Sequence, residues 1–590
     1  MTGLGISGRL TRTFIKSPLT PLLLVASIIV GALALIKLPR EEEPQISVPL
    51  VDIMVQTNGY KAGDGVELVT RPLEDIVKGI DGVEHVYSQT QDDQVLVTAR
   101  FLVGTDEDTA VLRVHEKIRA HIRELPKGLP EPLIVGRGID DVATVVLTLS
   151  AKKEAEKQWD DNGLYRVAED LQHDLTKVEN VGATYIVGGR PSQIRVEPDP
   201  ERLAQFGMTL AQVIDKVTNA NRSFQAGVLR QNNRAYPAVA GQTLRGVPDI
   251  GLLLLTSRDG RPVYLKDVAD VNVGSAQLDS RAWNMTPDGK GGFDTRPTVS
   301  LAIAKRKGSN AVLVADDILH RLETARGRVV PNDVQVDVTR NYGHTALEKA
   351  NELLFHLALA TVSIVILITM AIGWREGVVV AVVIPTTILL TLFASWLMGY
   401  TINRVSLFAL IFSIGILVDD AIVVVENIVR HWRMRGDRGL IETAVEAVAE
   451  VGNPTIVATL TIVAALLPMM FVSGMMGPYM SPIPANASMA MLFSFFVAVT
   501  ITPWLLLKIA GRHFEGGRGA QDHDPDDPGA MGRAYSRIAA QLLTGRSRSK
   551  KFLLIVGLLT LASLALFYTK SVRVKLLPFD NKSEIQVMVD

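Results

Sequence analysis

An uncharged stretch over residues 451–507 constrains the fold of this chain more than any other feature. It contains no Asp, Glu, Lys or Arg, and a helix needs only about 20 apolar residues to cross the hydrocarbon core of a bilayer. The stretch is long enough for two membrane spans, joined by a turn in the Gly- and Pro-rich segment 474–484. Together with a mean hydropathy of +0.22, it indicates an integral membrane protein.

Seven apolar segments are predicted to span the membrane. They are residues 17–36, 353–374, 377–402, 405–429, 452–473, 485–507 and 552–569. Arg9, Arg12 and Lys16 precede the first span, which places the N-terminus in the cytoplasm by the positive-inside rule. Basic clusters within 430–438 and 508–518 follow the fourth and sixth spans, on the same side of the membrane if the spans alternate. The predicted topology is therefore self-consistent.

The fourth span carries two adjacent carboxylates, Asp419 and Asp420, in an otherwise apolar run. A mid-membrane carboxylate is costly to ionise, so such residues usually face a bundle interior or a wet cavity and mark an ion or proton path. Gly415 lies one helical turn before Asp419, where its missing side chain would let another helix approach closely. Glu426 falls on the same face two turns later. The alternative is a pair that only bonds neighbouring helices together.

Residues 38–351, between the first two spans, have soluble character. Strands predicted over 48–56, 83–89 and 94–102 alternate with helices over 63–79 and 106–124, an order close to a ferredoxin-like unit. The pattern recurs in split form. Its predicted elements are strand 142–150, helix 164–177, strand 183–187, strand 298–304, helix 309–326 and strand 334–338. Between the two parts lies an insertion, over residues 192–273, with short helices and strands of its own.

The motif Gly415-x3-Asp419-Asp420-x5-Glu426-Asn427 resembles the proton-relay motif of resistance-nodulation-division (RND) transporters. The segment RVEPDPERLAQFGMTL, at 195–210, resembles the entry to their docking region. The implied fold is an α-helical transmembrane bundle, with seven of an expected twelve spans present. It also has a large α+β periplasmic block, with ferredoxin-like porter subdomains and an inserted docking subdomain.

The resemblance divides the chain into named parts. Residues 1–38 are the cytoplasmic N-terminus and first span, 39–141 the first porter subdomain, 142–191 and 274–340 the second, 192–273 the docking subdomain, 508–551 a cytoplasmic linker with a short helix, and 570–590 the start of a second periplasmic block. Leu38-Pro39 recurs as Leu577-Pro578, so we expect two tandem repeats, of which this sequence covers about half. A lysine on a tenth helix, which pairs with the two aspartates in the family, would lie in the other half, and we expect no transport by this chain alone.

The resemblance also implies a function. Proton-motive force would drive H⁺/substrate antiport of hydrophobic or amphiphilic compounds, with Asp419 and Asp420 as the proton relay. The expected location is the bacterial inner membrane, and no cofactor is expected beyond the proton gradient. Expected partners are further copies in a homotrimer, a periplasmic adaptor (membrane fusion) protein, an outer-membrane channel, membrane lipid and small amphiphilic substrates.

Two alternatives stay open: a heavy-metal pump of the same superfamily and a truncated, non-transporting half-subunit. A methionine cluster within 469–491 suits a soft-metal path, although Met also fills irregular cores. The adjacent aspartates instead favour the drug and amphiphile branch. The predicted strand around 144–149 has no Phe, in contrast to relatives that export many drugs, so the substrate range could be narrower and include lipids or solvents.

Other classes of protein fit the sequence poorly. A net charge of −1 gives no sign of a nucleic-acid partner, and the chain has no cysteine for a disulfide, a thiolate metal site or a catalytic thiol. The histidines follow neither metal-site nor catalytic-triad spacing, and no phosphate-binding glycine loop occurs. We therefore expect a transporter and not an enzyme.

Overall fold

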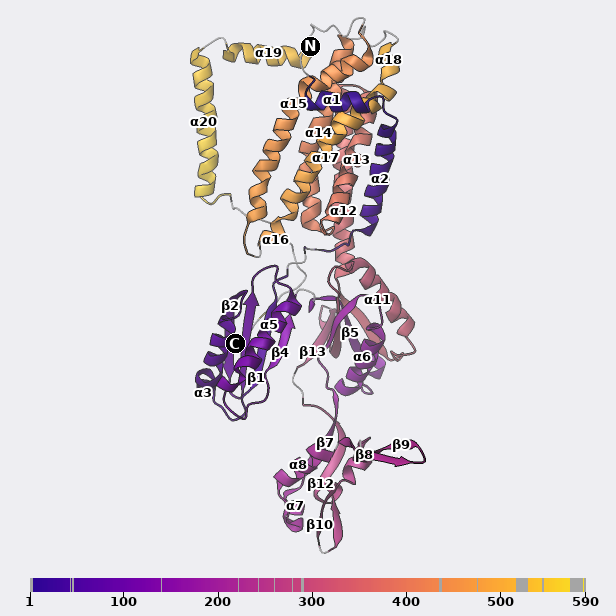
Figure 1. Cartoon of the computed structure of the whole chain (residues 1–590), viewed down its shortest axis with the longest axis vertical. Helices are drawn as coiled ribbons and strands as arrows, with labels where there is room; N and C mark the ends of the chain where they lie inside the picture. Colours follow the sequence, from indigo (N-terminus) through magenta and orange to yellow (C-terminus); the bar gives the residue numbers. More distant parts are fainter. Residues whose placement is uncertain are drawn as a thin grey trace. The chain divides into compact units, whose positions relative to one another are not determined.

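The computed structural model divides the chain into two units, Met1–Ala510 and Gly511–Asp590, which are considered separately (Figure 1). The described residues are 4–42, 44, 47–138, 141–220, 222–241, 244–258, 260–277, 280–287, 291–434, 438–474, 476–515, 529–543, 546–572 and 587.

Seven helical segments among the described residues are long and apolar enough to cross a membrane, as predicted. They are α2 (Leu19–Lys37), α12 (Tyr342–Ala371), α13 (Trp374–Leu397), α14 (Arg404–Arg433), α15 (Leu440–Leu466) with the 3-10 turn Leu467–Phe471, α16 (Met476–Met480) with α17 (Pro482–Ile509), and α20 (Arg546–Tyr568). Several begin well before the predicted spans, because helical hydrogen bonding continues past the apolar stretch that hydropathy detects.

Two boundaries differ for local reasons. The third span was predicted to reach residue 402, but α13 ends at Leu397, and Gly399 turns the chain with a φ of 75°. The predicted turn over 474–484 is mostly helical, because α16 occupies part of it and α17 begins at Pro482. Proline is tolerated in the first turn of a helix, where its missing N–H would have no partner.

In the first unit, α14 packs against α12, α13, α15 and α17, and these helices run side by side (Figure 1). The short helix α1 (Gly5–Phe14) packs on α15 and α17, and Thr11 Oγ1 donates to the carbonyl of Val499 at 2.7 Å. Helix α2 approaches α13 closely at Gly31, where a Cβ atom would clash with Leu389. The Asp-bearing helix is therefore surrounded on several sides by the chain's own helices.

The first mixed region is one four-stranded antiparallel sheet of order β2-β3-β1-β4. Its elements are β1 (Leu50–Gln56), α3 (Ala62–Gly65) with a π-helical turn (Val66–Thr70) and α4 (Arg71–Lys78), β2 (Val83–Gln91), β3 (Gln94–Phe101), α5 (Glu107–His121) and β4 (Leu133–Arg137). The alternating side chains of β1 and β3 fill a core beneath α4 and α5. Strand β4, absent from the prediction, completes the ferredoxin-like order.

The second mixed region repeats this topology across the insertion. Its elements are β5 (Ala143–Ala151), α6 (Asp161–Leu175), β6 (Val181–Val187), β13 (Ala282–Pro287), β14 (Phe293–Lys305), α11 (Ala311–Ala325) and β15 (Val334–Asn341). The sheet order is β13-β14-β5-β15, and β6 also pairs with β14. Strand β14 begins earlier than predicted because its first half pairs with β13, a strand the sequence did not reveal.

The insertion has its own small core and is closed by two antiparallel strands, β7 (Ser192–Pro198) and β12 (Ala269–Ser275). Between them lie α7 (Pro200–Phe206), α8 (Leu210–Ala220), β8 (Ser223–Gln231), β9 (Arg234–Gly241), α9 (Val247–Gly251), β10 (Leu254–Arg258), β11 (Arg261–Tyr264) and α10 (Leu265–Val268). Strands β8 and β9 form a hairpin that projects from the insertion (Figure 1).

The second unit contains α18 (Gly511–Glu515), α19 (Gly529–Leu543) and α20. Helix α19 packs on α20 and begins before the short helix expected at 534–543. Residues 516–528 and 544–545 of the expected linker, and nearly all of the predicted start of a second periplasmic block at 570–590, lie outside the described residues.

Candidate functional site

Helix α14 has a well-defined beginning. The Asn403 side chain accepts a hydrogen bond from the Ser406 amide at 2.9 Å, and the Ser406 hydroxyl accepts one from the Asn403 amide at 3.0 Å. This reciprocal capping box satisfies amides that would otherwise have no partner at the helix start. The position and register of the two aspartates, four turns along, are thereby fixed.

Asp420 points to the interior of the bundle. Its side chain is buried, with 9% of the residue surface exposed. One turn earlier, the Ser494 hydroxyl of α17 donates to the Leu417 carbonyl of α14 at 2.5 Å, so α17 lies directly against this side of the helix. The Asp420 Oδ2 atom is buried and has no hydrogen-bond partner among the described residues. A buried polar atom in this state is costly and normally requires a water, a proton or a conformational change.

Asp419 lies on a different face, because successive residues of a helix are about 100° apart. It is exposed, as are Gly415 and Glu426 on the same face. Phe408 and Phe412, each 52% exposed, continue this face towards the start of α14. We call the face formed by Phe408, Phe412, Gly415, Asp419 and Glu426 the open face of α14. Among the described residues, Asp420 is therefore buried in the bundle, whereas Asp419 is exposed, and the expectation that the pair faces a bundle interior or a wet cavity stays a prediction.

The close helix approach predicted at Gly415 is not made by the described residues and stays a prediction. A Cβ atom added there would meet no atom within 4 Å among them. The reason is that the neighbouring helices of the first unit cover the other sides of α14 and leave the open face exposed.

Asn427 lies two turns after Asp420 and on nearly the same side of the helix as Asp420. Its amide donates to the Ala447 carbonyl of α15 at 2.9 Å and to Glu450 Oε2 at 3.4 Å. The ring nitrogen Nε2 of His431 lies 2.7 Å from the same Glu450 oxygen. Asn427 therefore ties the end of α14 to α15 and does not lie beside the aspartates.

Two polar contacts of this bundle were not predicted. Besides the Ser494 contact, Ser395 of α13 donates to Asn486 of α17 in the buried interior. Single serines and asparagines in apolar helices have no distinctive pattern, so sequence periodicity alone could not identify them. The structure finds them through helix packing.

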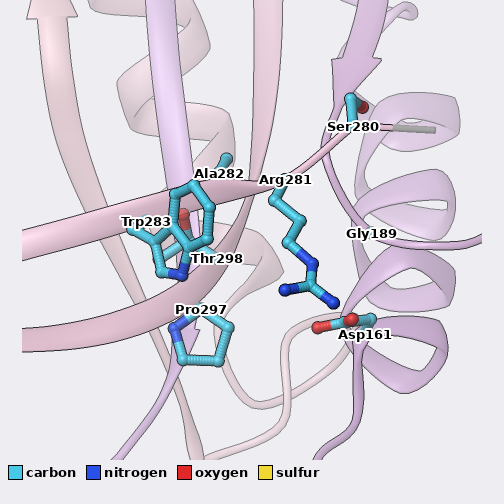
Figure 2. Close-up of a pocket in the computed structure, with 8 residues that line it drawn as sticks. All are labelled: Asp161, Gly189, Ser280, Arg281, Ala282, Trp283, Pro297 and Thr298. Carbon is cyan, nitrogen blue, oxygen red and sulfur yellow. The ribbon is translucent and has the colours of Figure 1, made fainter. Parts of the chain in front are cut away.

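Elsewhere, the second mixed region has a cavity of about 210 Å³ between the start of α6 and strands β13 and β14. Asp161, Arg281, Trp283 and Pro297 are among its lining residues, and Figure 2 shows the Arg281 guanidinium extending towards Asp161. Another cavity, of about 380 Å³, lies in the insertion between Phe206 and Arg258. No described cluster of three or more His, Asp or Glu side chains could hold a metal ion.

Comparison with known families adds an independent finding. The family model described as the AcrB/AcrD/AcrF family matches residues 10–590, almost the whole sequence. The match includes all of α14 with its two aspartates, the other candidate spans and both mixed regions. The chain therefore belongs to the AcrB/AcrD/AcrF family of RND-type efflux transporters.

Proposed function

We propose that the protein is the inner-membrane permease of an RND-type efflux system and exports hydrophobic or amphiphilic compounds in exchange for protons. Asp419 and Asp420 are the proton-binding pair in this proposal. The observation that carries it is the buried, unpartnered carboxylate oxygen of Asp420 on a helix that could cross the membrane. Ordinary helix packing gives no reason to place an acid there.

A proton on Asp420 would change how α14 packs. The ionised side chain would present a buried charge to α17, whereas the protonated side chain is neutral and offers one O–H donor. The Ser494 hydroxyl, now bonded to the Leu417 carbonyl, is one group within this interface that such a change would disturb. Proton binding and release would thus favour two different α14–α17 arrangements, as a proton-driven transporter requires.

Asp419 has a complementary role in this proposal. We infer that the open face of α14 is completed by a further membrane helix that carries a cation, as the lysine of the family's tenth helix would. Two exposed phenylalanines and the exposed carboxylate of Asp419 on one face support this inference. The phenylalanines offer apolar surface to a packing helix, and an ionised carboxylate near the middle of the membrane is costly unless a cation pairs with it. With such a partner, Asp419 would interact with the cation on the open face, whereas Asp420 would interact with α17.

The remaining assignments follow the family. We propose that the N-terminus is cytoplasmic, that the mixed regions are periplasmic porter subdomains with a docking insertion, and that a trimer works with an adaptor and an outer-membrane channel. The segment 144–149, which has no Phe, lies in β5, a strand buried at eight of its nine positions, and the narrower substrate range expected from it stays a prediction. The aromatic side chain at the cavity of the second mixed region is Trp283 instead.

The test is substrate-coupled proton flux in proteoliposomes that contain the protein as its gene encodes it. We expect an amphiphilic dye to drive proton movement that Asp420→Asn and Asp419→Asn abolish. Glu446→Gln, which removes an exposed carboxylate on α15, is the matched control and should leave the flux intact.

Coupled flux that survives Asp420→Asn would refute the proposal. Flux driven by copper or silver ions but not by the dye would instead support the heavy-metal alternative. A protein that inserts correctly but gives no flux with either substrate would favour the non-transporting half-subunit.

A further inference from the structure

A buried ion pair links two segments that lie far apart in the sequence. Glu41 follows α2, and Lys305 is the last residue of β14. Lys305 Nζ lies 2.9 Å from Glu41 Oε1, and the two side chains are 9% and 4% exposed, respectively. Burial of both charges costs desolvation free energy unless each charged group is paired and hydrogen-bonded.

The second oxygen of Glu41 continues the contact towards α14. It accepts a hydrogen bond from the Thr401 hydroxyl at 3.1 Å, and this hydroxyl accepts one from the Asn403 side-chain amide at 3.0 Å. Asn403 is the residue that caps α14. An uninterrupted chain of hydrogen bonds therefore runs from Lys305, at the end of β14, to the beginning of the helix that carries the two aspartates.

The backbone around Glu41 reinforces this connection. The Glu41 amide donates to the Ile402 carbonyl at 2.9 Å, and the Ile402 amide donates to the Pro39 carbonyl at 2.8 Å. On the other side, the amide of Ala311, the first residue of α11, donates to the Arg40 carbonyl at 3.2 Å. The short segment after α2 is thus held both by the loop before α14 and by the start of α11.

We propose that the Glu41–Lys305 pair couples α14 to the second mixed region, so that a shift of α14 reaches the end of β14 and the start of α11. The inference rests on the proposed function, in which a proton on Asp420 moves α14. A buried ion pair is weak evidence for stability, because an apolar pair often stabilises a fold equally well. It is better suited to holding two elements in one defined register, which is what a coupling contact needs.

A second connection between these parts provides an internal reference. Strand β15 continues directly into α12, which itself packs on α14. Movement of the helices can therefore reach β15 through the covalent chain, independently of Lys305. Helix α12 also packs on the start of α11, where Gly343 lies against Ala311. Loss of the ion pair should consequently reduce the response of residues 305–311 and spare that of β15.

Hydrogen exchange followed by mass spectrometry tests the proposal on the whole protein, with Asp420→Asn as a mimic of the protonated state. In the native background, we expect Asp420→Asn to change exchange at residues 403–407, at 305–311 and in β15. The expected size is about fivefold, the effect of one net hydrogen bond. With Lys305→Met or Glu41→Gln added, the change at 305–311 should shrink while those at 403–407 and in β15 persist undiminished.

Further variants guard against simple misfolding. Glu41→Met combined with Lys305→Met removes both charges without leaving one buried and unpaired, and should also reduce the response at 305–311. The charge exchange Glu41→Lys with Lys305→Glu should restore part of it. Lys307→Met alters an exposed lysine two residues away and should change nothing.

Two outcomes would overturn the inference. An undiminished response at 305–311 in the Met–Met variant would show that the ion pair carries no coupling, even though Asp420 moves α14. No response to Asp420→Asn anywhere, including 403–407, would overturn both the inference and the proton-driven function on which it rests.

Discussion

Asp174 provides a quantitative test of how the second mixed region is held together. It lies in α6 with its side chain 6% exposed, and it accepts hydrogen bonds from Arg321 Nε at 3.1 Å, Arg321 Nη2 at 2.7 Å and Arg328 Nη2 at 2.9 Å. Arg321 lies on α11, so this one carboxylate joins the two helices that cover the sheet. We predict that Asp174→Asn weakens that connection.

The magnitude follows from the contacts. A hydrogen bond to a charged group contributes about 1.5–3 kcal/mol when buried, and three such bonds would suggest a large loss. However, the side chains of Arg321 and Arg328 are 40% and 59% exposed, so they regain water, and an asparagine oxygen still accepts one bond. We therefore expect Asp174→Asn to lower the free energy of local unfolding by about 2 kcal/mol at neutral pH.

The pH dependence is a second, independent part of this prediction. The hydrogen bond from Arg321, aided by the charges of Arg321, Arg328 and Lys177, outweighs desolvation and holds the pKa of Asp174 below its ordinary value. A carboxylate with a lowered folded-state pKa stabilises the fold above its unfolded pKa of about 3.9 and loses this contribution as pH falls through the folded value. The difference between the native protein and Asp174→Asn should be constant from pH 7 to 5 and shrink below about pH 4.

The chain contains no cysteine, which makes a thiol-labelling assay possible. In an Ala168→Cys background, the introduced thiol lies at a fully buried position of α6 and reacts only when this region opens. Its labelling rate with dithiodipyridine, measured against urea concentration and pH, gives the local unfolding free energy. Asp170→Asn, an exposed carboxylate on the same helix, is the control. A neutral-pH difference below about 0.5 kcal/mol, or one that does not shrink in acid, would refute the reasoning.

Two further predictions concern the helix bundle. Gly31→Ala should separate α2 from α13 and lower the melting temperature, because its Cβ would clash with the side chain and backbone of Leu389. Gly415→Ala should not lower the melting temperature, because its Cβ would meet no described atom and Ala favours a helix over Gly. Equal melting curves for the two variants would contradict the packing. Ser494→Ala should destabilise the bundle by about 1 kcal/mol, because its hydrogen bond to the Leu417 carbonyl is lost. Unfolding in mixed detergent measures this change, with Ser363→Ala, at an exposed serine, as the control. Equal stability of the two variants would argue against the Ser494 contact.

The sequence predicted the candidate spans well because a span is recognised by the apolar composition of about 20 consecutive residues, which does not depend on tertiary contacts. It predicted much less about which side of a helix is covered. Helical spacing correctly put Gly415 and Asp419 on one face, yet only the arrangement of the other helices shows that this face is open while Asp420 is buried. The interior contact of Ser494 depends on the same arrangement.

The missed strands have a related explanation. β4 is a short segment, Leu133–Arg137, that follows a proline-rich stretch, and its strand conformation depends on pairing with β1. β13 has largely exposed side chains and exists because it pairs with the first half of β14. In both strands the stabilising partner is distant or tertiary, so local periodicity carries little signal.

The pairing of β7 with β12 has a consequence for how the second mixed region folds. β6 and β14 are neighbours in the sheet although the whole insertion separates them in the sequence. Bringing the ends of so long a loop together costs conformational entropy before any contact compensates for it. Once β7 and β12 have paired, residues 192 and 275 are already adjacent, and only a short distance of chain remains to be closed. We therefore predict that mutations that unfold the core of the insertion slow assembly of a sheet to which they contribute no residue.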